Sequence, residues 1–174
     1  MKTKTEKILD VLNVLTWIVF IGLLIQTGAI LISYGISLFN PEAAGNLYTG
    51  MDLSSLRESG ILKYTCAVSL KIAILCLKAY SAYLVIKILT KINMSNPFNS
   101  EIAGLIEKVS NVILDILIIT IIANEYSNWL SDNDLVLRGT REAGEFLFLA
   151  GVIFVFAQIF KKGVELQSEN ELTI

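Results

Sequence analysis

Long apolar runs dominate the pattern of this chain, and shorter polar stretches separate them. The runs cover residues 8–39, 61–89, 102–123 and 146–160. A helix needs about 20 residues to cross roughly 30 Å of hydrocarbon. Ala143 and Gly144 can extend the fourth run, which reaches that length only if Glu142 and Glu145 lie at the membrane interface. A backbone in lipid must satisfy its own hydrogen bonds, so each run is expected to be an α-helix. The pattern therefore predicts four membrane spans, at about residues 11–37, 62–88, 103–124 and 143–161.

The connections between these runs predict how the spans are arranged. They are short, so sequential spans are expected to be antiparallel, in one all-α domain over residues 1–174: an integral membrane four-helix bundle with up-down topology. The first run is too long for a secretory signal, whose apolar core is about 7–15 residues. Asn99 or Ser100 is expected to cap the third span. The remaining segments are predicted to be outer loops at 40–60 and 125–141, an inner loop at 90–101 and a tail at 163–174.

The placement of lysine and arginine predicts the orientation. Residues near one membrane face include seven lysines: Lys2, Lys4, Lys7, Lys87, Lys91, Lys161 and Lys162. The opposite face has Arg57, Lys63, Arg138 and Arg141, mixed with acidic residues. Cytoplasmic loops carry the excess of positive charge, so both termini and the 90–101 loop are predicted to be cytoplasmic.

The amino-acid composition excludes several classes of function. Of the residues 54% are hydrophobic and only 17% are charged, whereas soluble domains have about 25% charged residues. This excludes most soluble enzymes, and the dispersed lysines form no patch for direct nucleic-acid contact. Histidine is absent, and Cys66 and Cys76 lie ten residues apart, so neither a metal nor a thiol-redox site is indicated. No catalytic or nucleotide-binding motif is present. We therefore expect a protein that is not an enzyme and has no cofactor, with the lipid bilayer as its main partner.

Polar residues inside the predicted spans form the first candidate site. Lys71 and Asp115 are predicted to lie at similar depth on adjacent spans, where pairing would reduce the cost of a charge in lipid. Spacings of four or seven residues are interpreted as interior faces of the bundle. The cluster either fixes helix register as a buried ion pair or serves as a proton relay or ligand site. Its members are Lys71, Lys78, Asp115, Asn111, Glu107, Gln26 and Gln158.

Two stretches carry a family resemblance. One is residues 87–99, ending in Asn96-Pro97-Phe98-Asn99, and the other is residues 145–174, from Glu145-Phe146-Leu147-Phe148 through the tail. Together they resemble an uncharacterised family of bacterial four-span membrane proteins that is known only as a domain of unknown function. The resemblance implies a bacterial inner-membrane protein without assigned activity. It also implies a possible partner, because members are often encoded beside a small helix-turn-helix regulator.

The tail and the inner loop form the second candidate site. Gly163 is expected to end the fourth helix, and the alternation after it fits an extended segment or a short helix on the inner face. The tail either packs only on its own protein or recruits a soluble protein, and Phe98 in the inner loop offers it an apolar contact. The proposed cytoplasmic interaction surface consists of Pro97, Phe98, Glu165, Leu166, Gln167, Glu169, Asn170 and Leu172.

Three functional hypotheses follow. The first is a non-enzymatic regulatory or interaction protein that uses its cytoplasmic loop and tail. The second is a small ion- or proton-coupled transporter that uses Lys71, Lys78 and Asp115. The third is an immunity or envelope-stress factor that acts through its outer loops. Small residues on the helix faces are also compatible with a homo-oligomer.

Overall fold

Helices make up almost all of the structure, a computed structural model that describes residues 4–92, 99–130 and 143–171. The all-α prediction is confirmed for this part of the chain, which contains no strand. The helices are α1 (Lys4–Phe39), the 3-10 helix η1 (Pro41–Asn46), α2 (Ser54–Ser59), α3 (Ile61–Lys91), α4 (Ser100–Trp129) and α5 (Ala143–Glu171).

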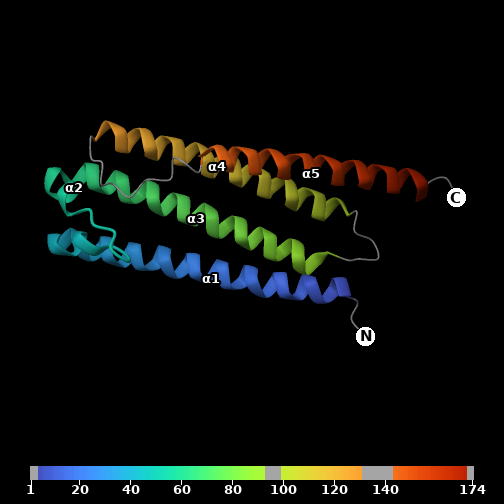
Figure 1. Cartoon of the computed structure of the whole chain (residues 1–174), viewed down its shortest axis with the longest axis horizontal. Helices are drawn as coiled ribbons and strands as arrows, with labels where there is room; N and C mark the ends of the chain where they lie inside the picture. Colours follow the sequence, from blue (N-terminus) through green and yellow to red (C-terminus); the bar gives the residue numbers. More distant parts are fainter. Residues whose placement is uncertain (1–3, 93–98, 131–142, 172–174) are drawn as a thin grey trace.

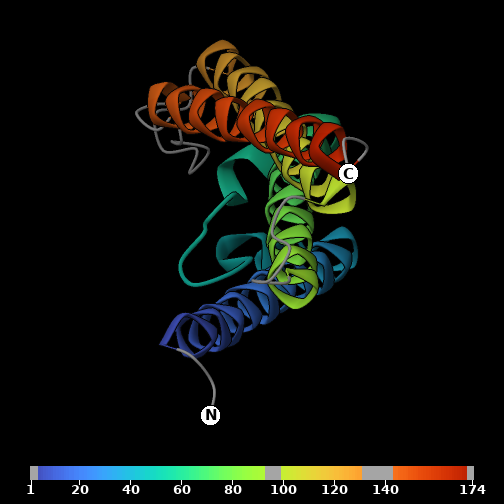
Figure 2. The ribbon, with the colours of Figure 1, turned by 90° about the vertical axis from the view of Figure 1, so that its right-hand side faces the viewer.

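The four long helices lie side by side in the order in which they follow along the chain. In the described part of the chain α3 packs between α1 and α4, and α5 packs on α4 (Figure 1). Seen along the helices, α1 lies at one edge of the molecule, and α4 and α5 lie on the far side of α3 (Figure 2). The arrangement is thus an open row, in which only long helices that follow one another along the chain pack together, and the predicted four-helix bundle is not found among the described residues.

The helix bounds agree with the predicted spans and extend beyond them. Each of the four long helices contains one predicted span, and their lengths are 36, 31, 30 and 29 residues. The predicted cap of the third span is confirmed, because the Asn99 side-chain oxygen accepts a hydrogen bond from the Glu101 backbone N–H at 2.7 Å. The predicted outer loop 125–141 begins later, since α4 continues to Trp129.

The tail differs from its prediction. Gly163 does not end a helix, because α5 continues without a break to Glu171. A glycine in a helix interior costs about 1 kcal/mol relative to alanine, which is too little to stop a helix that is already propagating. An ion pair between Lys162 and Glu165, one turn apart with 2.8 Å between Nζ and Oε2, spans the glycine.

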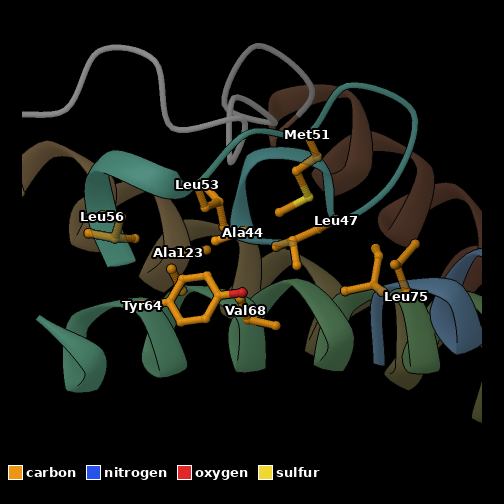
Figure 3. Packing of buried hydrophobic residues seen from close by; sticks show 11 residues of the cluster. Ala44, Leu47, Met51, Leu53, Leu56, Tyr64, Val68, Leu75 and Ala123 are labelled. Atoms are coloured by element: carbon orange, nitrogen blue, oxygen red, sulfur yellow. The ribbon is translucent and has the colours of Figure 1, made fainter. Parts of the chain in front are cut away.

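Residues 40–60, predicted as a loop, instead form a folded helical cap over α3. It contains η1 and α2, and the Leu53 backbone N–H donates to the Ala44 carbonyl at 2.8 Å. Leu47, Leu53 and Leu56 are buried against Tyr64 of α3 (Figure 3). Gly50, with φ of 84°, makes the reversal between the two short helices in a backbone conformation that favours glycine.

Candidate functional site

The predicted polar cluster does not converge on one place. Lys91 and Glu101 form an ion pair that ties the adjacent ends of α3 and α4 together. At a rise of about 1.5 Å per residue, Lys78 and Asp115 both lie about 20 Å from this pair, whereas Lys71 lies about 30 Å from it. Asp115 is therefore level with Lys78 and not with Lys71, and the expected pairing of Lys71 with Asp115 is not found.

The expected interior faces are also wrong for three members of the cluster. Asn111, Asp115 and Gln158 are exposed, while Gln26 and Lys71 are half-buried. Glu107 turns toward α5, where its carboxylate accepts a hydrogen bond from the Lys161 Nζ at 2.8 Å. Residues at spacings of four or seven lie on shared faces of any regular helix. The spacing did not identify which face meets a neighbour, because in an apolar helix the buried and the exposed faces have similar composition.

Lys78 lies in a groove that all four long helices line. The groove has a volume of about 520 Å³, and its walls are apolar except for Lys78, Thr16 and Ser81. Asp115 does not line it, although the neighbouring Ile113 and Ile116 do. The two ionisable groups at the same depth thus face different surroundings, and the geometry provides no single pathway through Lys71, Lys78 and Asp115.

The second candidate surface lies on the last turns of α5. Glu165 and Glu169 are exposed, Leu166 has half of its surface exposed and Gln167 is half-buried. The hydrogen bond and the charge of Lys162 hold the pKa of the Glu165 carboxyl below its ordinary value, and Glu165 raises the pKa of Lys162. The other residues of this predicted interaction surface lie outside the part of the chain that the structure describes: Pro97, Phe98, Leu172 and the side chain of Asn170.

The sequence analysis missed a polar network beneath the helical cap. The buried Ser37 hydroxyl lies 2.6 Å from the Tyr64 hydroxyl and donates to the Tyr34 carbonyl at 2.7 Å. Tyr34 in turn lies 3.0 Å, hydroxyl to hydroxyl, from Thr65. The Arg57 Nε–H donates to the Ser37 carbonyl over 3.4 Å, which ties α2 to the end of α1. Hydroxyl residues in an apolar helix are a signal for such contacts between helices.

A second missed contact joins α4 and α5. The buried Ser110 hydroxyl donates to the Ala150 carbonyl at 3.3 Å. Both side chains are small, which allows the two backbones to approach closely. Among the residues that the structure describes, no three His, Cys, Asp or Glu side chains are close enough to hold a metal ion.

Comparison with known proteins gives one result. No curated protein and no solved structure matches the chain. A family model matches residues 40–174, which begin at the helical cap and include α3, α4 and α5 but leave out α1. The match covers most of the chain and confirms the resemblance to an uncharacterised family. The chain therefore belongs to the family described as "Protein of unknown function (DUF2975)".

Proposed function

We propose that this protein is a four-span inner-membrane protein with both termini in the cytoplasm, and that the end of α5 is a docking element for a soluble regulatory partner. The observation that carries the proposal is the unbroken continuation of α5 through residues 163–171. A polar helix that projects from a membrane domain presents side chains at fixed positions, which an unstructured tail does not.

The surface of α1 supports insertion into lipid. Ile18, Ile25 and Ile32 are seven residues apart on one helix face, and each has more than 60% of its surface exposed. Contiguous exposed apolar surface of this extent is unfavourable in water. The most apolar windows of α1 and α3 have mean hydropathies of 2.4 and 1.9, sufficient for a membrane span. α4 and α5, with 30 and 29 residues, exceed the about 20 residues that a span requires.

Charge at the ends of the helices supports the orientation. The beginning of α1 and the end of α5 lie at the same end of the row (Figure 1), and that end also carries the Lys91–Glu101 and Lys161–Glu107 ion pairs. The predicted spans and the excess of lysine at this end favour its placement in the cytoplasm. The helical cap would then lie on the opposite, non-cytoplasmic face of the same membrane.

The order of charged residues along the end of α5 favours a basic partner. Lys161 and Lys162 mark the membrane boundary, and Glu165, Glu169 and Glu171 follow on the projecting turns. Leu166, half exposed between the acidic residues, offers an apolar contact. An acidic helix with one apolar side chain suits a small protein that has a basic face. The helix-turn-helix regulator implied by the family resemblance is a candidate of this kind, because DNA-binding proteins are basic where they meet phosphate.

Charge reversal on the projecting helix tests the proposal. The double variant Glu165→Lys and Glu169→Lys should lose the copurification of a soluble protein from detergent-solubilised membranes while the protein still inserts. The matched control is Glu42→Lys with Glu58→Lys, which reverses two exposed charges at the opposite end and should leave copurification unchanged. Retention of the same partners by the α5 variant would contradict the proposal.

A further inference from the structure

A second groove lies between α1 and α3, on the face of α3 opposite Lys78. It has a volume of about 350 Å³, and among the described residues it is lined by these two helices alone. Phe20 and Leu24 belong to its wall on α1, and residues between Cys76 and Tyr83 form its wall on α3. The rings of Phe20 and Tyr83 lie next to each other, with their centroids 6.1 Å apart. Apolar and aromatic walls of this kind suit a hydrocarbon chain.

A lysine stands at one end of this groove. Lys87 follows Tyr83 by one turn on the same face of α3, and its Nζ lies 4.8 Å from the centroid of the Tyr83 ring. A cation–π contact of this kind leaves the N–H groups of the ammonium able to donate hydrogen bonds. Lys87 has no ion pair with any residue that the structure describes. Residues 1–3 and 93–98, which adjoin this end of α1 and α3 in the sequence, contain no Asp or Glu. The positive charge is therefore available to an anion at the mouth of the groove.

The length of the groove matches one leaflet of a bilayer. This step depends on the proposed four-span insertion, in which the span at residues 62–88 places Lys87 at the membrane boundary. At about 1.5 Å per residue, Cys76 lies about 16 Å deeper than Lys87, and half of a hydrocarbon core of roughly 30 Å is about 15 Å. At that depth α1 and α3 close on each other, since Ile30 and Leu75 are almost fully buried in one cluster. The groove thus runs from the headgroup level to the middle of the bilayer, which is the reach of one acyl chain.

We propose that this groove binds an anionic phospholipid, with one acyl chain between α1 and α3 and the phosphate at Lys87. A free phosphate ion would leave the apolar groove empty, and a neutral chain would leave Lys87 without a counter-ion. A zwitterionic headgroup supplies a phosphate but also brings a cation close to the Lys87 ammonium, which lowers the net attraction. The attraction of one lysine to anionic lipid corresponds to about a fivefold preference over zwitterionic lipid.

Quenching of Trp17 fluorescence tests the site, because the Trp17 ring meets Phe20 edge-on, with the ring centroids 5.7 Å apart. In a Trp129→Phe background Trp17 is the single tryptophan. This protein is reconstituted in phosphatidylcholine bilayers that contain increasing fractions of a lipid with brominated acyl chains, either phosphatidylglycerol or phosphatidylcholine. Half-maximal quenching should occur at about a fivefold lower fraction of the brominated phosphatidylglycerol.

Three variants locate this preference. Lys87→Gln should abolish it, whereas Lys7→Gln, which removes an exposed lysine at the same end of the row, should retain it. Cys76→Phe, which fills the groove without a change of charge, should weaken the preference although Lys87 is present. Equal quenching by the two lipids in the parent protein would overturn the proposal. An equal loss in the two lysine variants would do the same, as would an undiminished preference in Cys76→Phe, because each would assign the effect to general surface charge.

The same measurement separates this site from the proposed insertion. A bilayer made entirely of brominated phosphatidylcholine should quench Trp17 strongly, because the residue lies within the first predicted span. Absence of quenching there would contradict the four-span insertion, and the lipid site with it. Strong quenching without a preference for phosphatidylglycerol would leave the insertion standing and remove only the lipid site.

Discussion

The helical cap and the middle of the helix row are stabilised in different ways. In the cap, Leu47, Leu53 and Leu56 pack around Tyr64 with almost no exposed surface, and the hydroxyls beneath them are hydrogen-bonded. In the middle of the row, each helix is buried on part of its surface, and Lys78 and Asp115 face in different directions. The cap shares its buried core with α1, α3 and α4, whereas the middle of the row has a smaller core between α3, α4 and α5 and leaves large apolar surfaces exposed.

This difference shows where the fold is determined within one chain and where its surroundings contribute. Close packing and satisfied hydrogen bonds stabilise the cap in any solvent that leaves the helices intact. The isoleucines of α1 and Asp115 of α4 are exposed in this chain, and they differ in what would suit them: apolar surroundings for the first and polar ones for the second. Under the proposed insertion, the exposed isoleucines of α1 would face lipid, and Asp115 is the exposed group least suited to it.

The largest effect should come from opening the core of the cap. Leu53→Ala should lower the free energy of unfolding by about 2–5 kcal/mol, because it removes a buried side chain and leaves a cavity. Ile25→Ala, at a position with 62% exposure, should change it by less than about 1 kcal/mol, since no cavity forms. Unfolding by denaturing detergent in mixed micelles measures both. Equal losses would show that the cap is no better packed than the surface of α1.

A smaller effect should come from the hydroxyl network beneath the cap. Tyr64→Phe removes the bond to Ser37 and should cost about 1 kcal/mol. Ser37 keeps its bond to the Tyr34 carbonyl, so no buried hydroxyl is left without a partner. Tyr80→Phe, on the exposed face of α3, is the matched control and should be close to neutral in the same unfolding measurement. A loss at Tyr80 as large as that at Tyr64 would argue against the role of this network.

The smallest effect should be a pH dependence of the projecting turns of α5. The pKa of Glu165 is lowered from its ordinary value of 4.5, first by the hydrogen bond from Lys162 and then by its charge. The stabilisation of these turns is complete above pH 4.5 and is lost as the pH falls through the lowered pKa. Carbonyl chemical shifts of residues 162–169 against pH measure it. Glu165→Gln should remove the dependence, and an unchanged titration in that variant would assign it to another group.

Much of the fold was predictable, and the reasons are local. The apolar runs placed all four long helices, because a long run of apolar residues has few alternatives to a helix, and extension beyond the apolar residues completed the fourth. Asn99 was recognised as the N-terminal capping residue of α4 because an asparagine before a polar helical turn accepts a hydrogen bond from a backbone N–H of that turn. The cap at 40–60 was missed because its apolar residues are interrupted by glycine and polar residues, so no periodic pattern marks them.

The candidate sites were less predictable for a different reason. The spacing of Glu107, Asn111 and Asp115 predicted one interior face, yet Glu107 meets Lys161 while the other two are exposed in this chain. In a soluble protein the apolar face of a helix is the buried one, so periodicity also identifies the interior. A helix in lipid is apolar all round, and the hydrophobic pattern cannot distinguish lipid from a neighbouring helix.

The amino-acid sequence determined that the chain is helical, where the long helices run and which end carries the positive charge, because these depend on residue type and chain length. Tertiary structure decided that the helices form an open row, that Asp115 is level with Lys78 and not with Lys71, and that α5 continues past Gly163. The first two features depend on how the helices pack against one another, and the third on the small cost of glycine within a helix and on the Lys162–Glu165 ion pair. In a chain whose faces are nearly all apolar, that choice is made by the shapes of side chains and by a few hydrogen bonds between helices.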